Sequence, residues 1–184
     1  MFSERLSFGG AALHLYGETP WQLSPACAPF RTEAAPAAHE IHLRLSDTMP
    51  TPPDGTPCSL RTYRWRTGAQ RHTLHDHVSD FTYAVTDGNS TELTVSTGYA
   101  GNLRTQLLLE AVDLFDILAE RGMLVLHSSY VLRKEGDAIL FSGASGIGKS
   151  TQAELWREFA SARVINGDRA LIDVDRGIAH GIFY

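Results

Sequence analysis

Residues 138–160, AILFSGASGIGKSTQAELWREFA, contain the strongest local pattern in this chain. Within them, the segment 143–150 satisfies GxxxxGK[ST] in full. The four apolar residues at 138–141 predict a strand that enters this segment, and apolar residues at helical spacing predict a helix that leaves it. A strand, a glycine-rich loop and a helix in this order are typical of a loop that holds the phosphates of a nucleotide.

Each residue type in the loop suits phosphate chemistry. The glycines let successive main-chain N–H groups surround phosphate oxygens, and a helix N-terminus adds further N–H donors. Lys149 can bridge the β- and γ-phosphates, Ser150 can ligate Mg²⁺, and Thr151 can contact the α-phosphate. The predicted nucleotide-binding residues are Gly143, Ala144, Ser145, Gly146, Ile147, Gly148, Lys149, Ser150 and Thr151. The alternative is a glycine-rich turn with a coincidental lysine.

The composition narrows the classes of protein. Of 184 residues, 43% are hydrophobic and 20% charged, which is ordinary for a globular chain. The net charge of −5 argues against nucleic acid as a partner, and apolar runs such as 123–126 are too short to span a membrane. Residues 1–10 lack the pattern of a secretory signal, so we expect a cytoplasmic protein. Cys27 and Cys58 indicate no disulfide framework, although a single bridge stays open.

The first hundred residues predict mainly strands. Apolar and polar residues alternate over 41–45 and 61–66. Two further strands, 81–86 and 91–97, flank the sequence DGNS at 87–90, which is typical of a hairpin turn. This region is therefore expected to be rich in β structure.

A single helix is predicted next, over 103–121, with Asn102 as its N-cap and Gly122 at its end. The composition changes near this point. We therefore expect two domains, a β-rich N-terminal module over 1–100 and a second part over 101–184 that contains the loop. The strands and helices predicted in the second part favour an α/β fold.

The residues around the loop extend the pattern. Segments 123–133 and 138–142 predict an antiparallel hairpin, with the sequence HSS at 127–129 on its first strand, and RVINGDR at 163–169 follows the helix. This order resembles the HPr kinase/phosphorylase catalytic domain, and more loosely the phosphoenolpyruvate carboxykinases, over 123–175. It is most similar to HPr-kinase-like proteins encoded beside peptide-modifying enzymes.

That resemblance implies both a fold and a chemistry. It implies an α/β P-loop core, ATP and Mg²⁺ as ligands, a peptide, protein or small molecule as phosphate acceptor, and it leaves a homo-oligomer open. It implies a histidine near the phosphates at His127, the phosphate-binding lysine at Lys149, and metal ligation by Ser150 and Asp168. Family members also continue further and carry a later glutamate, so the core is expected to be incomplete at its C-terminus.

Asp168 is also indicated by its position alone. It follows a short apolar strand, 164–165, one helix and one strand after the loop, which can bring its carboxylate beside the phosphates. There it can hold Mg²⁺ or accept the proton of an attacking hydroxyl. A structural turn is the other interpretation, since Asn-Gly-Asp suits a turn. The resemblance implies two adjacent aspartates here, and the first is Gly167 in this chain.

Three functions remain in competition. The first is an ATP-dependent kinase in which Asp168, His127 and Lys149 are catalytic. The second is a nucleotide-binding regulatory or scaffold protein without efficient phosphate transfer, which Gly167 favours. The third is an interaction module whose β-rich region binds a peptide by strand addition.

Two further clusters of residues each have a functional and a structural interpretation. A histidine cluster could ligate zinc, but solvated strand and loop residues are the favoured interpretation of His72, His75 and His77. An arginine cluster beside aromatic residues could contact nucleic acid, but a solvated basic edge is favoured for Arg61, Arg64 and Arg66.

Overall fold

The computed structural model of the protein describes residues 2–18, 21, 23–33, 38–77, 80–102 and 104–183, with the backbone alone at 77, 80, 81 and 102. The chain divides into two compact units. Unit 1 comprises Met1–Ser7 and Ala11–Ile117, and unit 2 comprises Phe8–Gly10 and Leu118–Tyr184. The domain boundary expected near residue 100 stays a prediction.

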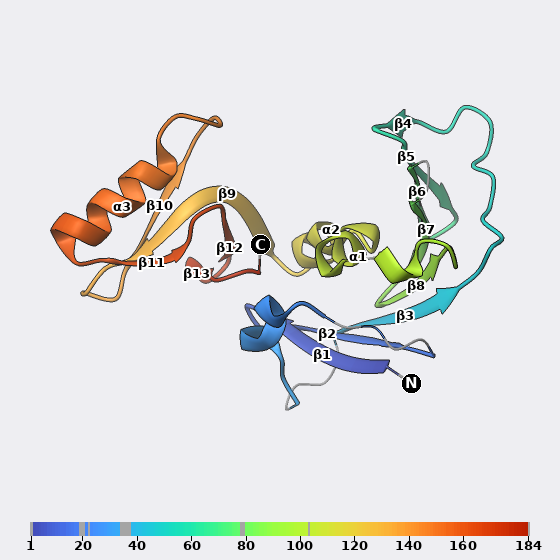
Figure 1. Ribbon diagram of the computed structural model, residues 1–184, viewed down its shortest axis with the longest axis horizontal. Helices are drawn as coiled ribbons and strands as arrows, with labels where there is room; N and C mark the ends of the chain where they lie inside the picture. Colours follow the sequence, from blue (N-terminus) through green and yellow to red (C-terminus); the bar gives the residue numbers. More distant parts are fainter. Residues whose placement is uncertain are drawn as a thin grey trace. The chain divides into compact units, whose positions relative to one another are not determined.

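Unit 1 is built on an eight-stranded sheet, coloured blue to green in Figure 1, in the order β1-β2-β3-β8-β7-β6-β5-β4. Its strands are β1 (Phe2–Phe8), β2 (Ala11–Gly17), β3 (His39–Leu45), β4 (Cys58–Ser59), β5 (Thr62–Thr67), β6 (Gln70–His77), β7 (Asp80–Asp87) and β8 (Ser90–Val95). Strand β3 pairs in parallel with both β2 and β8, whereas β4 to β8 follow one another as antiparallel neighbours. The sheet is therefore mixed.

The local predictions in this sheet are largely confirmed. The turn between β7 and β8 has Gly88 at φ +53°, a conformation that glycine adopts without strain. One sheet face carries the fully buried core, including Leu13, Ile41 and Leu93. Short 3₁₀ helices occupy Pro25–Phe30 and Ala100–Asn102.

The single helix predicted over 103–121 is wrong. Residue 103 lies outside the described residues, and two short helices follow, α1 (Thr105–Ala111) and α2 (Leu114–Ala119). Asp113 interrupts them with φ +52°, and its carboxylate accepts hydrogen bonds from the Thr73 hydroxyl and, at 3.1 Å, from the Arg64 guanidinium. A residue in the left-handed conformation ends an α-helix. The hydrogen bonds from Arg64 and Thr73 of the sheet fix Asp113 in this conformation and therefore explain the break between the helices. Gly122, at φ +73°, follows α2 as predicted.

Unit 2 contains five strands and the longest helix within the described residues. They are β9 (Met123–Leu132), β10 (Ala138–Ser142), α3 (Lys149–Ala160), β11 (Arg163–Asn166), β12 (Arg169–Asp173) and β13 (Ile178–His180). The sheet order is β10-β9-β12-β13, and β11 pairs with β9 beyond the end of β12. Every one of these pairings is antiparallel.

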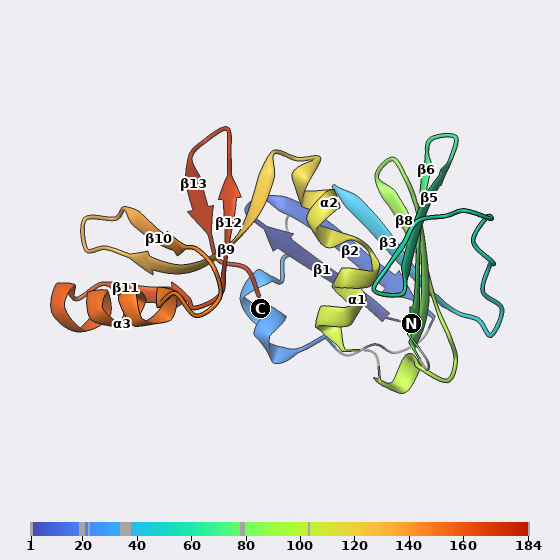
Figure 2. The same ribbon diagram turned by 90° about the horizontal axis from the view of Figure 1, so that it is seen from above.

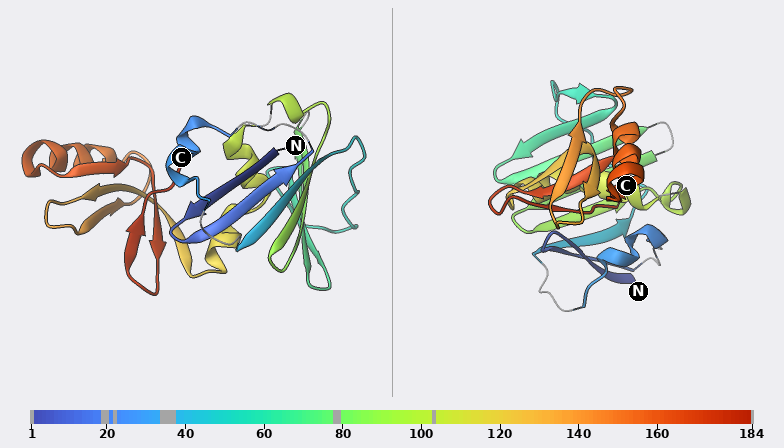
Figure 3. Two further views of the ribbon diagram at one scale, coloured as in Figure 1. Left: turned by 90° about the horizontal axis from the view of Figure 1, so that it is seen from below. Right: turned by 90° about the vertical axis from the view of Figure 1, so that its left-hand side faces the viewer.

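Helix α3 lies along one side of the β9–β10 hairpin (Figures 2 and 3). A small apolar core joins them. It consists of Val131, Ala153 and Ala162, with Ile139, Phe141, Trp156 and Val164 packed around it. The predicted hairpin over 123–133 and 138–142 is confirmed, with Ile139 opposite Val131 in its register.

The expected α/β class is wrong. The protein is mostly β: of the residues that the structure describes, 45% lie in strands and 20% in helices. Its strands are joined chiefly by hairpins, which need short turns rather than the crossover helices of a parallel sheet. In the described part of the chain, no helix is long and apolar enough to cross a membrane.

Candidate functional site

The glycine-rich loop connects the end of β10 to the start of α3, as the sequence predicts. Gly146 has φ +80°, and Gly148, the N-cap of α3, has φ +100°. Side chains disfavour both conformations, so glycine is needed at these two positions. Residues 142–147 are exposed to solvent. The first N–H groups of α3 have no acceptor within the helix and therefore remain available for an anion beside an open loop.

Lys149 is folded back over this loop. Its ammonium group donates hydrogen bonds to the carbonyl oxygens of Gly143, at 3.1 Å, and Ala144, at 3.2 Å. Carbonyl oxygens are neutral acceptors, whereas phosphate oxygens are charged and form stronger bonds to an ammonium group. Ser150 and Thr151 are exposed in the first turn of α3. The lysine is thus held at the loop in a position from which a phosphate can compete for it.

Strand β9 brings two other predicted residues to the same end of the hairpin. The Ser142 hydroxyl at the end of β10 donates to the main-chain oxygen of His127 at 3.0 Å. On the other edge of β9, the N–H of Ser128 donates to the main-chain oxygen of Asp168 at 2.9 Å. Beside it, the Ser129 hydroxyl donates to the oxygen of Gly167 at 2.8 Å. The end of β10 and the turn at 167–168 therefore flank the same short stretch of β9.

The side chains of His127 and Asp168 meet across this stretch. Nε2 of His127 lies 3.0 Å from Oδ1 of Asp168, and the two side chains are 55% and 57% exposed. Because side chains alternate along a strand, His127 projects from the same face of β9 as Val131, which packs beneath α3. The His127–Asp168 contact therefore shares a face and an end of the sheet with the loop.

Asn166 holds the turn that carries Asp168. Its side-chain oxygen accepts the N–H groups of Asp168, at 2.9 Å, and Arg169, at 3.1 Å, and its amide donates to the oxygen of Ile182 at 2.8 Å. Nε of Arg169 also lies 3.4 Å from the second carboxylate oxygen of Asp168. Both oxygens of this carboxylate therefore face a basic side chain.

The donor set at this end fits Mg²⁺ bound together with a nucleotide. No group of three or more metal-ligating side chains occurs within the described residues. Mg²⁺ does not need one, since it is usually held by one or two protein oxygens, waters and the substrate's phosphates. The Ser150 hydroxyl and the Asp168 carboxylate are hard oxygen donors of that kind.

The histidine cluster is not a metal site in the part of the chain described. His72 and His75 lie on opposite faces of β6, and the side chain of His77 lies outside the described residues. His72 is buried rather than solvated, accepts or donates a 2.8 Å bond with the Tyr83 hydroxyl, and stacks on Trp65 at 5.0 Å. This burial lowers the pKa of His72.

The three arginines of the cluster are exposed, as the sequence predicts. Arg61 pairs with Asp76 at 3.3 Å and Arg64 with Asp113 at 3.1 Å, so two of the three arginines are in ion pairs. Cys27 and Cys58 are both free thiols, and no bridge joins them.

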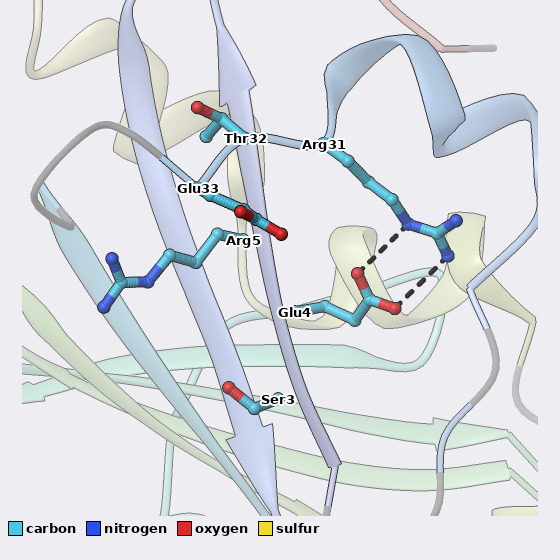
Figure 4. Close-up of a pocket in the computed structure, with 6 residues that line it drawn as sticks. All are labelled: Ser3, Glu4, Arg5, Arg31, Thr32 and Glu33. Carbon is cyan, nitrogen blue, oxygen red and sulfur yellow. Dashed lines mark hydrogen bonds and ion pairs between the residues drawn. The ribbon is translucent and has the colours of Figure 1, made fainter.

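Two hollows in unit 1 were not predicted. Figure 4 draws one of about 490 Å³, lined by Ser3, Glu4, Arg5, Arg31, Thr32 and Glu33. In it, Glu4 accepts two bonds from the Arg31 guanidinium, at 3.0 and 3.2 Å, and the Arg5 guanidinium points away from that pair. Both hollows join residues distant in sequence, which local patterns do not reveal. Ser142 was missed for the same reason, whereas the turn that Asn166 holds was already indicated by the sequence Asn-Gly-Asp.

Comparison with known proteins adds no relative. No protein-family model matches the chain, and no curated protein matches it. The likeness to HPr kinase therefore rests on the residues of the loop, His127 and Asp168, and it stays a prediction.

Proposed function

We propose that unit 2 binds Mg·ATP at residues 143–151 and transfers its γ-phosphate to a hydroxyl or carboxylate of a peptide or small molecule, in the manner of HPr kinases. The observation that carries this proposal is the 3.0 Å pair of His127 and Asp168 at the end of the hairpin that feeds the loop. To bind a nucleotide, the loop needs only its own residues, whereas phosphate transfer needs further groups beside it. A carboxylate–imidazole pair beside it offers a route for the proton of an attacking hydroxyl.

The residues have separate roles in this reaction. The ammonium group of Lys149 exchanges the carbonyls of Gly143 and Ala144 for phosphate oxygens. Ser150 and Asp168 would hold Mg²⁺, which would supply positive charge to offset the negative charge of the phosphates. When the acceptor is a hydroxyl, Asp168, supported by His127, takes the hydroxyl proton as the hydroxyl oxygen bonds to the γ-phosphorus; an ionised carboxylate acceptor attacks without proton loss. The bond from the γ-phosphorus to the bridging oxygen breaks, and ADP leaves.

Cleavage of ATP with water as the acceptor tests this proposal without knowledge of the natural substrate. We expect ADP to accumulate when Mg·ATP is incubated with the full chain, and Asp168→Asn to slow it at least about 100-fold, since general-base assistance contributes about 10² to 10⁴. Asp137→Asn is the matched control, because Asp137 is also an exposed aspartate paired with an arginine in unit 2. Equal rates for the wild type and Asp168→Asn would refute the transfer role.

A nucleotide-binding regulatory or scaffold protein is the second candidate. It is favoured by one observation, namely that both oxygens of Asp168 face His127 and Arg169 while Gly167 supplies no second carboxylate. That function predicts nucleotide affinity without measurable ATP cleavage, and an unchanged affinity in Asp168→Asn. The same assay, run beside a binding titration, therefore separates the two functions.

A further inference from the structure

The second hollow of unit 1 lies under the long connection between β3 and β4, which Figure 1 draws in cyan to teal. Its cavity measures about 470 Å³. One side is the segment 49–56, MPTPPDGT, and the floor is formed by Tyr63, Leu74 and Asp76. Tyr63 and Leu74 are direct partners in the β5–β6 register. Leu74 projects from the face of β6 opposite to Thr73, whose hydroxyl bonds Asp113, so the hollow opens on the other side of the sheet.

The wall of this hollow is stiff before anything binds. Pro50, Pro52 and Pro53 restrict the backbone of the segment, because each proline ring fixes φ. The turn that follows is closed by Thr56, whose hydroxyl and N–H donate to the oxygen of Pro53 at 2.6 and 3.1 Å. A wall ordered in advance reduces the entropy lost on binding.

The lining favours a positively charged group. The described residues of the lining include two carboxylates, Asp54 and Asp76, and no lysine or arginine. Arg61 donates to one oxygen of Asp76, at 3.3 Å. The Tyr63 ring and the buried Leu74 side chain supply an apolar floor. An aliphatic stem that ends in a cation matches this combination, since the stem packs on apolar surface and the cation interacts with carboxylates and an aromatic ring.

An exposed leucine stands beside the hollow. Leu60, at the turn between β4 and β5, is 89% exposed. Leu60 and Arg61 have φ of +47° and +57°, in the left-handed region that side-chain-bearing residues rarely adopt. This conformation places Arg61 against Asp76 and leaves a large apolar side chain in water next to it. A second, apolar contact for a partner is thus available one residue from the ion pair.

We infer that this hollow binds a basic peptide, with a lysine or arginine side chain between Tyr63 and Asp76 and an apolar neighbour against Leu60. The segment 49–56 contributes Asp54 as a second carboxylate. No residue of the phosphate loop takes part, so the inference stands or fails independently of the proposed kinase function.

The test is an NMR titration of the full chain with acetyl-Leu-Arg-amide, beside acetyl-Leu-citrulline-amide as an uncharged probe of the same shape. We expect shifts at 49–56, Tyr63 and Leu74, and an affinity for the arginine peptide at least about tenfold higher than for the citrulline peptide. The arginine affinity should also fall as salt is added. Equal affinities, shifts confined to other residues, or no shifts at all would overturn the inference.

Charge variants locate the contact. Asp54→Asn and Asp76→Asn should each weaken the arginine peptide about three- to tenfold, whereas Asp47→Asn, an exposed aspartate just outside the hollow, should leave it unchanged. Asp76→Asn loses the ion pair with Arg61 and can fold less well for that reason. Asp54 is exposed, so Asp54→Asn tests the charge of the hollow without this complication. Leu60→Ser should weaken both peptides equally. An equal loss in Asp47→Asn would contradict the assignment.

Discussion

Nε2 of His127 lies 3.0 Å from Oδ1 of Asp168, although 41 positions separate the two residues, because both are attached to the same stretch of β9. His127 belongs to that strand. The main-chain oxygen of Asp168 accepts a hydrogen bond from the N–H of Ser128 at the edge of the same strand. The Ser142 hydroxyl ties the end of the loop-bearing strand to the same place at 3.0 Å. Three chain segments thus converge on one dipeptide, which is the structural basis of the proposed transfer site.

Replacement of His127 tests whether the imidazole supports Asp168. His127→Gln can still donate to the carboxylate from its amide, whereas His127→Ala cannot. We expect ATP cleavage to fall about tenfold or more in His127→Ala and less in His127→Gln, with nucleotide affinity nearly unchanged in both. Cleavage rates and binding titrations measured on the same samples check this. An equal effect of the two variants would show that the hydrogen bond to Asp168 is not what matters.

Gly167→Asp tests whether a second carboxylate beside Asp168 increases the rate of ATP cleavage. A Cβ added at Gly167 meets no atom within 4 Å, and its backbone lies outside the left-handed region, so the aspartate fits without strain. If one carboxylate currently serves both metal and proton, a second should raise ATP cleavage at least about tenfold. Gly101→Asp, at another open glycine, is the matched control. A cleavage rate that stays at the wild-type level in Gly167→Asp would contradict this account of the site.

Asp113 is expected to stabilise unit 1. Asp113→Ala removes the acceptor for Arg64 and Thr73 and leaves alanine at φ +52°, so we expect a loss of about 2 kcal/mol in the free energy of unfolding. Asp113→Asn should lose less, since asparagine tolerates this backbone conformation. The control Asp116→Ala changes an exposed aspartate of α2 and should stay within about 0.5 kcal/mol. Urea denaturation measures all three, and equal losses at 113 and 116 would refute the role.

His72 predicts a pH dependence of stability. Burial lowers the pKa of His72 in the folded chain. At a pH below the ordinary histidine value of about 6.5, the unfolded chain therefore binds a proton at this residue more readily than the folded chain does. Stability should therefore fall as the pH drops from about 7.5 to about 5.5. His72→Phe keeps an aromatic ring against Trp65 but cannot titrate, so its stability should fall less over the same range. Denaturation curves at both pH values check the difference, and identical losses would exclude His72 as a contributor.

The parts that sequence reasoning recovered are those set by neighbouring residues. The hairpin of β9 and β10, the loop and α3 follow from alternation, glycine placement and helical spacing within 143–160 and the residues just before it. His127 and Asp168 were each indicated, but their contact depends on the pairing of β9 with a segment beyond α3. Short-range patterns contain no such information.

The failures have the same physical origin. The break at Asp113 is held by Thr73 and Arg64, which lie 40 and 49 positions away in the chain. The parallel pairing of β3 with β2 and β8 and the hollow beneath 49–56 likewise join distant segments. The α/β class failed because one glycine-rich loop with its strand and helix does not determine how the remaining strands pair.

Calorimetric titration of Mg·ATP into the full chain, beside Lys149→Ala, measures whether residues 143–151 hold a nucleotide. Lys134→Ala is the matched control, because Lys134 is an exposed lysine in the same unit. We expect the wild type and Lys134→Ala to bind Mg·ATP equally, and Lys149→Ala to bind it at least about tenfold more weakly, since a charge-assisted contact to phosphate is lost. Equal affinity in Lys149→Ala, or no binding by the wild type, would contradict the claim that this loop holds a nucleotide.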